Sequence, residues 1–120
     1  RTNGRGLVYP SLSSKISSIK RSQLIKHIVL LNFKPTTTPQ QIADCLQAAT
    51  KMLTPIPGVK NFFTGKSLPV RGEPKYNYAL LMEFADEAVF KAYREHPEHV
   101  KFATQMMRPI VEEILILDYT

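Results

Sequence analysis

The spacing of apolar residues along the chain predicts four strands and two helical regions. Alternating apolar and polar positions indicate strands at residues 26–33, 59–67, 77–84 and 114–119. Apolar residues three and four positions apart predict one helix from Pro39 to a turn at 54–58, and a second helical region that ends at Pro109. The order β-α-β-β-α-β is that of a ferredoxin-like unit. We therefore expect an α+β fold with one four-stranded antiparallel sheet.

Capping residues mark where the helices begin. Thr38, followed by Pro39 and with Gln41 three positions on, has the pattern of a capping box. Asp86 is a suitable N-cap for the second helical region. Cys45 lies on the apolar stripe of the first helix, so we predict a buried structural thiol rather than a nucleophile.

The predicted strands carry apolar residues on both faces. In the first strand His27, Val29 and Leu31 share one face, whereas Ile28 and Leu30 share the other. Two helices can cover only one face of a four-stranded sheet, so the other face needs a partner surface. The pattern by itself predicts association without identifying the partner.

Candidate chemistry gathers around Pro97, where one tyrosine and two of the three histidines fall within seven residues. Pro97 disfavours the helical conformation at His96 and suits the first turn of a new helix, so Tyr93, His96 and His99 surround a kink. Histidine titrates near neutrality and a neighbouring tyrosine can donate to a carbonyl or enolate oxygen. His27, Tyr93, His96 and His99 are therefore the candidates for acid–base chemistry. The structural alternative assigns His96 to a helix cap and Tyr93 to a backbone carbonyl across the kink.

An apolar cavity beside this kink would be lined by the strand face that carries His27. The residues that we expect in this ligand pocket are His27, Val29, Leu31, Tyr78, Leu80, Met82 and His96.

The motif Tyr93-x-x-His96-Pro97-x-His99 resembles the signature of the stress-responsive A/B barrel (Dabb) family. The stretches 26–34 and 114–119 are similar to the first and last strands of that family. Residues 56–59, together with Gly65, are similar to the segment that connects its first helix to its second strand. The resemblance covers about residues 25–120. It implies a homodimer with a central α+β barrel, in which C-terminal strands often cross over.

The resemblance also suggests an activity. One plant member of the family is a polyketide cyclase whose catalytic tyrosine and histidine resemble Tyr93 and His99. On that pattern His99 would remove an acidic proton between two carbonyls while Tyr93 holds the carbonyl oxygen. This sequence departs from the cyclase, because Tyr78 replaces a pocket histidine and Cys45 and Ala49 replace bulky aromatics. The cyclase's substrate is therefore not carried over.

The charge distribution separates a basic tail from a nearly neutral domain. The net charge is +6, but residues 1–23 hold five of the sixteen Lys and Arg residues and none of the ten Asp and Glu residues. We expect 1–23 to be a disordered or loosely docked basic tail, either a linker or part of an organelle transit peptide, and 24–120 to be the folded A/B barrel domain. A nucleic-acid-binding domain more often carries a basic face on the fold, so no nucleic-acid partner is expected.

Other classes of site find little support. No apolar run is long enough to span a membrane, and one cysteine with three histidines has no zinc-site spacing. No phosphate-binding glycine loop follows a strand, so neither a metal nor a cofactor is expected. The lone cysteine favours an intracellular location, in the cytoplasm or in a plastid or other organelle if the tail is a transit remnant.

Three functions stay open at this stage. The first is a homodimeric A/B barrel protein of unassigned activity with an apolar cavity, and the second is a cofactor-independent cyclase or lyase that uses Tyr93 and His99 on a small apolar or polyketide-like ligand. The third is a non-catalytic interaction module. Whether the protein is an enzyme depends on an open pocket at Tyr93 and His99.

Overall fold

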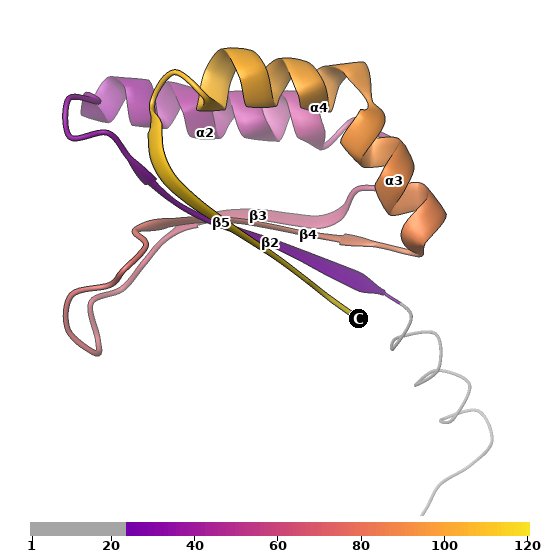
Figure 1. Cartoon of the computed structure of the whole chain (residues 1–120), viewed down its shortest axis with the longest axis horizontal. Helices are drawn as coiled ribbons and strands as arrows, with labels where there is room; N and C mark the ends of the chain where they lie inside the picture. The colour runs from indigo at the N-terminus through magenta and orange to yellow at the C-terminus, as the bar shows by residue number, and fades with distance from the viewer. Residues whose placement is uncertain (1–23) are drawn as a thin grey trace, which may run out of the picture.

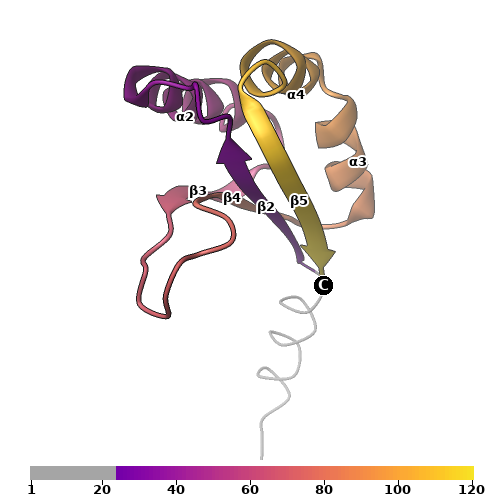
Figure 2. The ribbon, with the colours of Figure 1, turned by 60° about the vertical axis from the view of Figure 1, so that its left-hand side comes forward.

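The computed structural model of the chain describes residues 24–120, in which one antiparallel sheet is covered on one face by helices (Figures 1 and 2). The predicted tail at 1–23 lies outside the described residues. The elements in chain order are β2 (Ile25–Phe33), α2 (Pro39–Leu53), β3 (Lys60–Lys66), β4 (Tyr78–Phe84), α3 (Glu87–Glu95), α4 (Pro97–Lys101), the π-helix η1 (Phe102–Met107) and β5 (Val111–Tyr119).

The four strands lie in the order β3-β4-β2-β5, with all neighbours antiparallel. The first and last strands of the domain therefore pair with each other, as Figure 2 shows. This arrangement confirms the predicted ferredoxin-like α+β fold.

Helix α2 begins at the predicted capping box. The side chain of Thr38 accepts a hydrogen bond from the Gln41 backbone N–H at 3.1 Å, and the Gln41 side chain accepts one from the Thr38 N–H at 2.8 Å. Asp86 caps α3 by accepting from the Val89 N–H at 2.9 Å. Both predicted N-caps are confirmed, so local signals set the starts of α2 and α3.

The second helical region differs from an uninterrupted helix in two ways. It breaks between α3 and α4 at His96, as Pro97 predicts, and its last turn widens into the π-helix η1. The Arg108 N–H donates to the carbonyl of Ala103 at 3.0 Å, five residues back. Strand β5 then starts at Val111, three residues earlier than predicted, because an edge strand tolerates exposed glutamates at 112–113.

The core lies between the helices and one face of the sheet. Its largest fully buried side chains are Tyr93, Phe84, Leu31, Leu53, Met82 and Cys45. Burial raises the pKa of the Cys45 thiol to about 11, and Sγ lies 3.8 Å from the Met106 carbonyl oxygen. Cys45 is therefore a structural thiol in the core, as predicted.

The opposite face of the sheet is apolar and is not covered by any helix of the described part of the chain (Figures 1 and 2). The strand register places Leu30 of β2, Leu81 of β4 and the residues opposite them in the adjacent strands on this face. Phe63 of β3, which lies opposite Leu81, is 54% exposed. This outer face consists of Ile28, Leu30, Phe63, Ala79, Leu81, Leu115 and Leu117. None of the helices at 24–120 is long and apolar enough to cross a membrane.

Candidate functional site

A cavity of about 250 Å³ lies between the helix-covered face of the sheet and the helices around the kink. Most of its lining is apolar, and it includes both residues of the candidate catalytic pair, Tyr93 and His99. The lining residues are His27, Val29, Leu53, Leu80, Met82, Phe90, Tyr93, Arg94, His99, Phe102, Ala103, Met107, Ile114, Ile116 and Asp118. Ile114 and Ile116 remain about half exposed, so the cavity reaches the β5 edge of the sheet.

His27 is a buried polar residue held by a carboxylate. The register of β2 and β5 places it directly opposite Asp118, and its Nδ1 lies 2.5 Å from Asp118 Oδ1. Since a carboxylate accepts, Nδ1–H of His27 donates, which leaves Nε2 of the neutral ring free to accept a proton. The Asp118 carboxylate would also stabilise the positive charge that such a transfer creates on the imidazole.

His99 is held in the same tautomer by the backbone. Its Nδ1 lies 2.9 Å from the carbonyl oxygen of Arg94, so Nδ1–H donates across the kink and Nε2 is left unprotonated in the neutral ring. Burial lowers the pKa of His99 below its ordinary value. The hydrogen bond to the Arg94 carbonyl acts in the opposite direction, and the positive charge of Arg94 lowers the pKa further. The fold therefore favours the neutral form of His99.

Tyr93 packs against both histidines. Its ring centroid lies 4.6 Å from that of His99 and 6.1 Å from that of His27, and the side chain is fully buried. Burial raises the pKa of the phenol far above its ordinary value, so Tyr93 is a hydrogen-bond donor and not a proton source at neutral pH.

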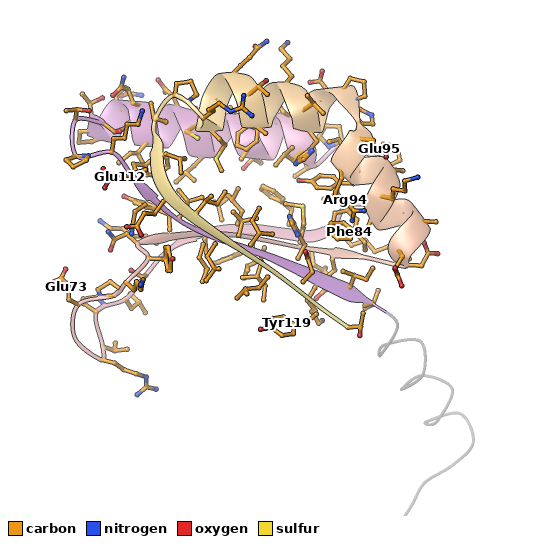
Figure 3. The ribbon with its side chains drawn as sticks, viewed as in Figure 1. Glu73, Phe84, Arg94, Glu95, Glu112 and Tyr119 are labelled. Carbon is orange, nitrogen blue, oxygen red and sulfur yellow. The ribbon has the colours of Figure 1, made fainter. Side chains whose placement is uncertain are left out.

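Aromatic rings hold these groups in place. Phe84 of β4 stacks on Phe90 at 5.0 Å between centroids and on Tyr93 at 4.8 Å, and Phe90 lies 5.1 Å from His27. In Figure 3 the labelled side chains of Phe84, from the sheet, and Arg94, from α3, both lie on the inner side of that helix. The site is thus a largely apolar, aromatic-lined pocket with a small set of polar groups.

The structure gathers most of the predicted pocket residues around this cavity. Four of the seven line it, namely His27, Val29, Leu80 and Met82, together with the candidate catalytic residues Tyr93 and His99. Three predicted pocket residues do not line it. Leu31 is fully buried in the core, and Tyr78 lies farther along the sheet, where its ring packs on Phe33 at 5.1 Å.

His96, the third of these residues, lies at the start of a helix. Its Nδ1 accepts a hydrogen bond from the Glu98 N–H at 3.1 Å, so it caps α4. His96 thus occupies the capping position that the structural alternative predicted. The carbonyl oxygen of Arg94, across the kink, accepts its hydrogen bond from His99 and not from Tyr93.

Sequence reasoning did not identify Asp118, Phe90 or Arg94 as parts of the site. Asp118 carried a usable signal, because it alternates with Ile114 and Ile116 and so belongs to the inner face of the last strand. Its pairing with His27 depends on the register of two strands that are far apart in sequence. Among residues 24–120 no group of three His, Cys, Asp or Glu residues could hold a metal ion.

Comparison with known proteins identifies the family to which this architecture belongs. Residues 25–120 match the model of the stress responsive A/B barrel domain (Dabb). The stress-response A/B barrel domain-containing protein HS1 of Arabidopsis thaliana is 26% identical over 96 residues, which cover 79% of this chain and 87% of HS1.

Solved structures agree with this match. A Dabb family protein with a ferredoxin-like fold from Mesorhizobium loti has a TM-score of 0.73 at 32% identity, covering 81% of this chain and 95% of that one. A dimeric ferredoxin-like protein of unknown function from Thermobifida fusca has a TM-score of 0.72 at 27% identity, covering 81% and 90%. The predicted resemblance is confirmed: the chain belongs to the stress-responsive A/B barrel domain family, and its activity is unassigned.

Proposed function

We propose that the protein is a homodimer that binds a small, largely apolar carbonyl compound and catalyses proton transfer at the carbon next to the carbonyl, without a cofactor. One observation carries the proposal. Two histidines, each with Nδ1 already hydrogen-bonded, and a buried tyrosine line the same apolar cavity.

The proposed step needs a base and an oxygen ligand. His27 Nε2 removes the proton, the carbon–hydrogen bond breaks, and its electron pair becomes the enolate. Tyr93 donates a hydrogen bond to the enolate oxygen. The proton then returns from the His27 imidazolium to that carbon. In a cyclase the enolate carbon instead forms a bond to a second carbonyl carbon of the same molecule, the π bond of that carbonyl breaks, and the resulting alkoxide takes the proton from His27. A lyase would break such a bond by the reverse of this step.

His27 is the preferred base because its partner is an anion. Asp118 compensates the charge of the imidazolium, whereas His99 binds only a carbonyl oxygen and its burial disfavours the charged form. His99 and Tyr93 without His27 remain the alternative pair, and variants can separate the two assignments.

Deuterium exchange provides the test. Benzoylacetone, a small aromatic diketone, is incubated with the protein in D₂O, and loss of the proton signal between its carbonyls is followed by NMR in excess of buffer exchange. Replacing the base, in His27→Gln, is expected to lower the excess rate by about a hundredfold, within the usual range for general-base catalysis. A larger loss in His99→Gln than in His27→Gln would instead assign the base to His99.

His96→Asn is the matched control, because it removes a histidine outside the cavity and asparagine is also a good N-cap. Its exchange rate should equal that of the wild type. Exchange no faster than buffer in the wild-type protein, or a rate unchanged in both cavity variants, would contradict the proposed activity.

The homodimer is proposed from the uncovered outer face. A sheet that is apolar on both faces is stable in water when a second surface covers the exposed one, and a second copy supplies the same apolar face. The dimeric relative from Thermobifida fusca supports this assembly.

A further inference from the structure

A second hollow lies beside the cavity and shares part of its wall. It has a volume of about 420 Å³ and opens between α3 and the ends of β2 and β5. Phe90, Arg94 and Asp118 line both hollows, so these three residues form the boundary between them. A ligand whose body occupies the inner cavity would therefore place its outer end beside Arg94.

Arg94 is a cation held in position, and it forms no ion pair with any residue at 24–120. Its guanidinium carbon lies 4.3 Å from the centroid of the Phe90 ring. The ion pairs formed within residues 24–120 are Lys26–Glu83, His27–Asp118 and Lys91–Glu95, and Arg94 belongs to none of them. Stacking on an aromatic face leaves the planar edge of the guanidinium available to a carboxylate, which it can bind through two hydrogen bonds.

The other charges around the boundary are of both signs. Lys91, one turn earlier on α3, lines the outer hollow and makes only a 4.0 Å contact with Glu95. Two carboxylates also line this hollow, namely Glu87 in the first turn of α3 and Asp118, which is engaged by His27. A carboxylate must therefore bind between Lys91 and Arg94, away from Asp118.

Arg94 also links the head of a ligand to the proposed chemistry. Its carbonyl oxygen accepts the hydrogen bond that fixes His99, and the preceding residue is Tyr93. An anionic group bound by the Arg94 side chain would thus hold the apolar body against Tyr93 and His99.

From this arrangement we infer that the ligand of the cavity is an amphipathic carboxylate, with its apolar body inside and its carboxylate on Arg94. The inference rests on the proposed function, since it names the class of molecule that the same cavity takes. Arg94 is a specificity-determining residue that binds the end of the ligand remote from the reacting carbon.

Three ligands of the same shape test the inference. Phenylpropanoate, phenylpropanol and phenylpropylamine share the apolar body and carry an anionic, a neutral and a cationic head group, and their dissociation constants are measured by NMR titration of the full chain. The wild type is expected to bind the acid about five- to tenfold more tightly than the alcohol, as for a partly solvated charged hydrogen bond. Added salt should reduce this preference, because it screens exposed charges.

Variants of Arg94 separate charge from shape. Arg94→Gln should remove the preference for the acid, because it weakens binding of the acid more than binding of the alcohol, and Arg94→Lys should restore part of the preference. Lys101→Gln is the matched control, because it removes an equal charge from α4 outside both hollows and should leave the preference intact.

Each other outcome has a defined meaning. Equal affinities for acid and alcohol in the wild type, or a preference that survives in Arg94→Gln, would overturn the inference. If the amine binds more tightly than the acid, the head group of the ligand lies on Asp118 and not on Arg94, which would also overturn the inference. If none of the three binds while benzoylacetone still exchanges its protons, only the inference fails. If neither binding nor exchange is seen, the proposed function fails with it.

Discussion

At the scale of single residues, the site depends on a few polar groups that are each tied to one partner. His99 shows how such an arrangement affects stability, because burial favours the neutral form of its imidazole over the charged form. The folded state therefore binds a proton less readily than the unfolded state. As the pH falls below about 6.5, the unfolded chain takes up this proton first and the protein loses stability.

Replacing His99 should remove this pH-dependent loss. Between neutral pH and about pH 5, His99→Gln is expected to lose less unfolding free energy than the wild type, with a difference in slope below about 1.4 kcal/mol per pH unit, the limit for one proton. Urea unfolding at three pH values measures the slopes. Parallel slopes in the two proteins would mean that burial does not affect the protonation of His99.

The residues of the site differ in how far the sequence could predict them. Tyr93 and His99 stand in one short motif around a proline, so their proximity follows from local geometry. His27 and Asp118 are 91 positions apart, and only the pairing of β2 with β5 brings them together. A period-two pattern identifies the inner face of each strand, but it does not say which residue lies opposite which.

At the scale of elements, the position of α3 depends on a glycine in the turn between α2 and β3. Gly58 has a φ of +92°, and a Cβ at this position would overlap Cγ1 of Val89 on α3. Val89 lies one turn before Tyr93, so pressure at this contact would move the helix that carries the site.

Two glycines allow this packing effect to be measured apart from backbone strain. Gly72 has nearly the same φ, +93°, but a Cβ there would meet no atom within 4 Å. Gly72→Ala is expected to cost about 1–2 kcal/mol from strain alone, and Gly58→Ala roughly 1–3 kcal/mol more because of the added overlap. Gly58→Ala should also weaken binding of phenylpropanoate. If chemical unfolding gives the same loss of unfolding free energy for Gly58→Ala and Gly72→Ala, α3 shifts to accommodate the added Cβ at no measurable cost.

The elements themselves were largely predictable, and the exceptions have physical causes. Thr38, Asp86 and Pro97 act through their immediate neighbours, so the starts of the helices followed from the sequence. The π-helix at 102–107 carries no such signal, since its wider turn depends on how Phe102 and Met107 pack against the rest of the core.

At the scale of the whole molecule, the two faces of the sheet have separate roles. The inner face, with the helices, encloses the cavity, and the outer face presents apolar side chains to a second copy in the proposed homodimer. The alternation of apolar residues on both faces already predicted this division, because helices at 39–53 and 87–107 can cover only one of them.

The outer face should therefore respond to a buried charge more strongly than any other apolar surface. Leu81 lies between Ile28 and Phe63 of the neighbouring strands, and Leu81→Glu would bury a carboxylate at the centre of the proposed interface. We expect this variant to be a monomer by light scattering, with a thermal midpoint that no longer rises with protein concentration. Val100→Glu is the matched control, because Val100 is 47% exposed on α4, and the same change there should leave a dimer. A dimeric Leu81→Glu variant, or a monomeric wild type, would mean that another surface covers the sheet. Since the cavity opens toward the β5 edge, the monomer would also show whether ligand binding needs the second copy.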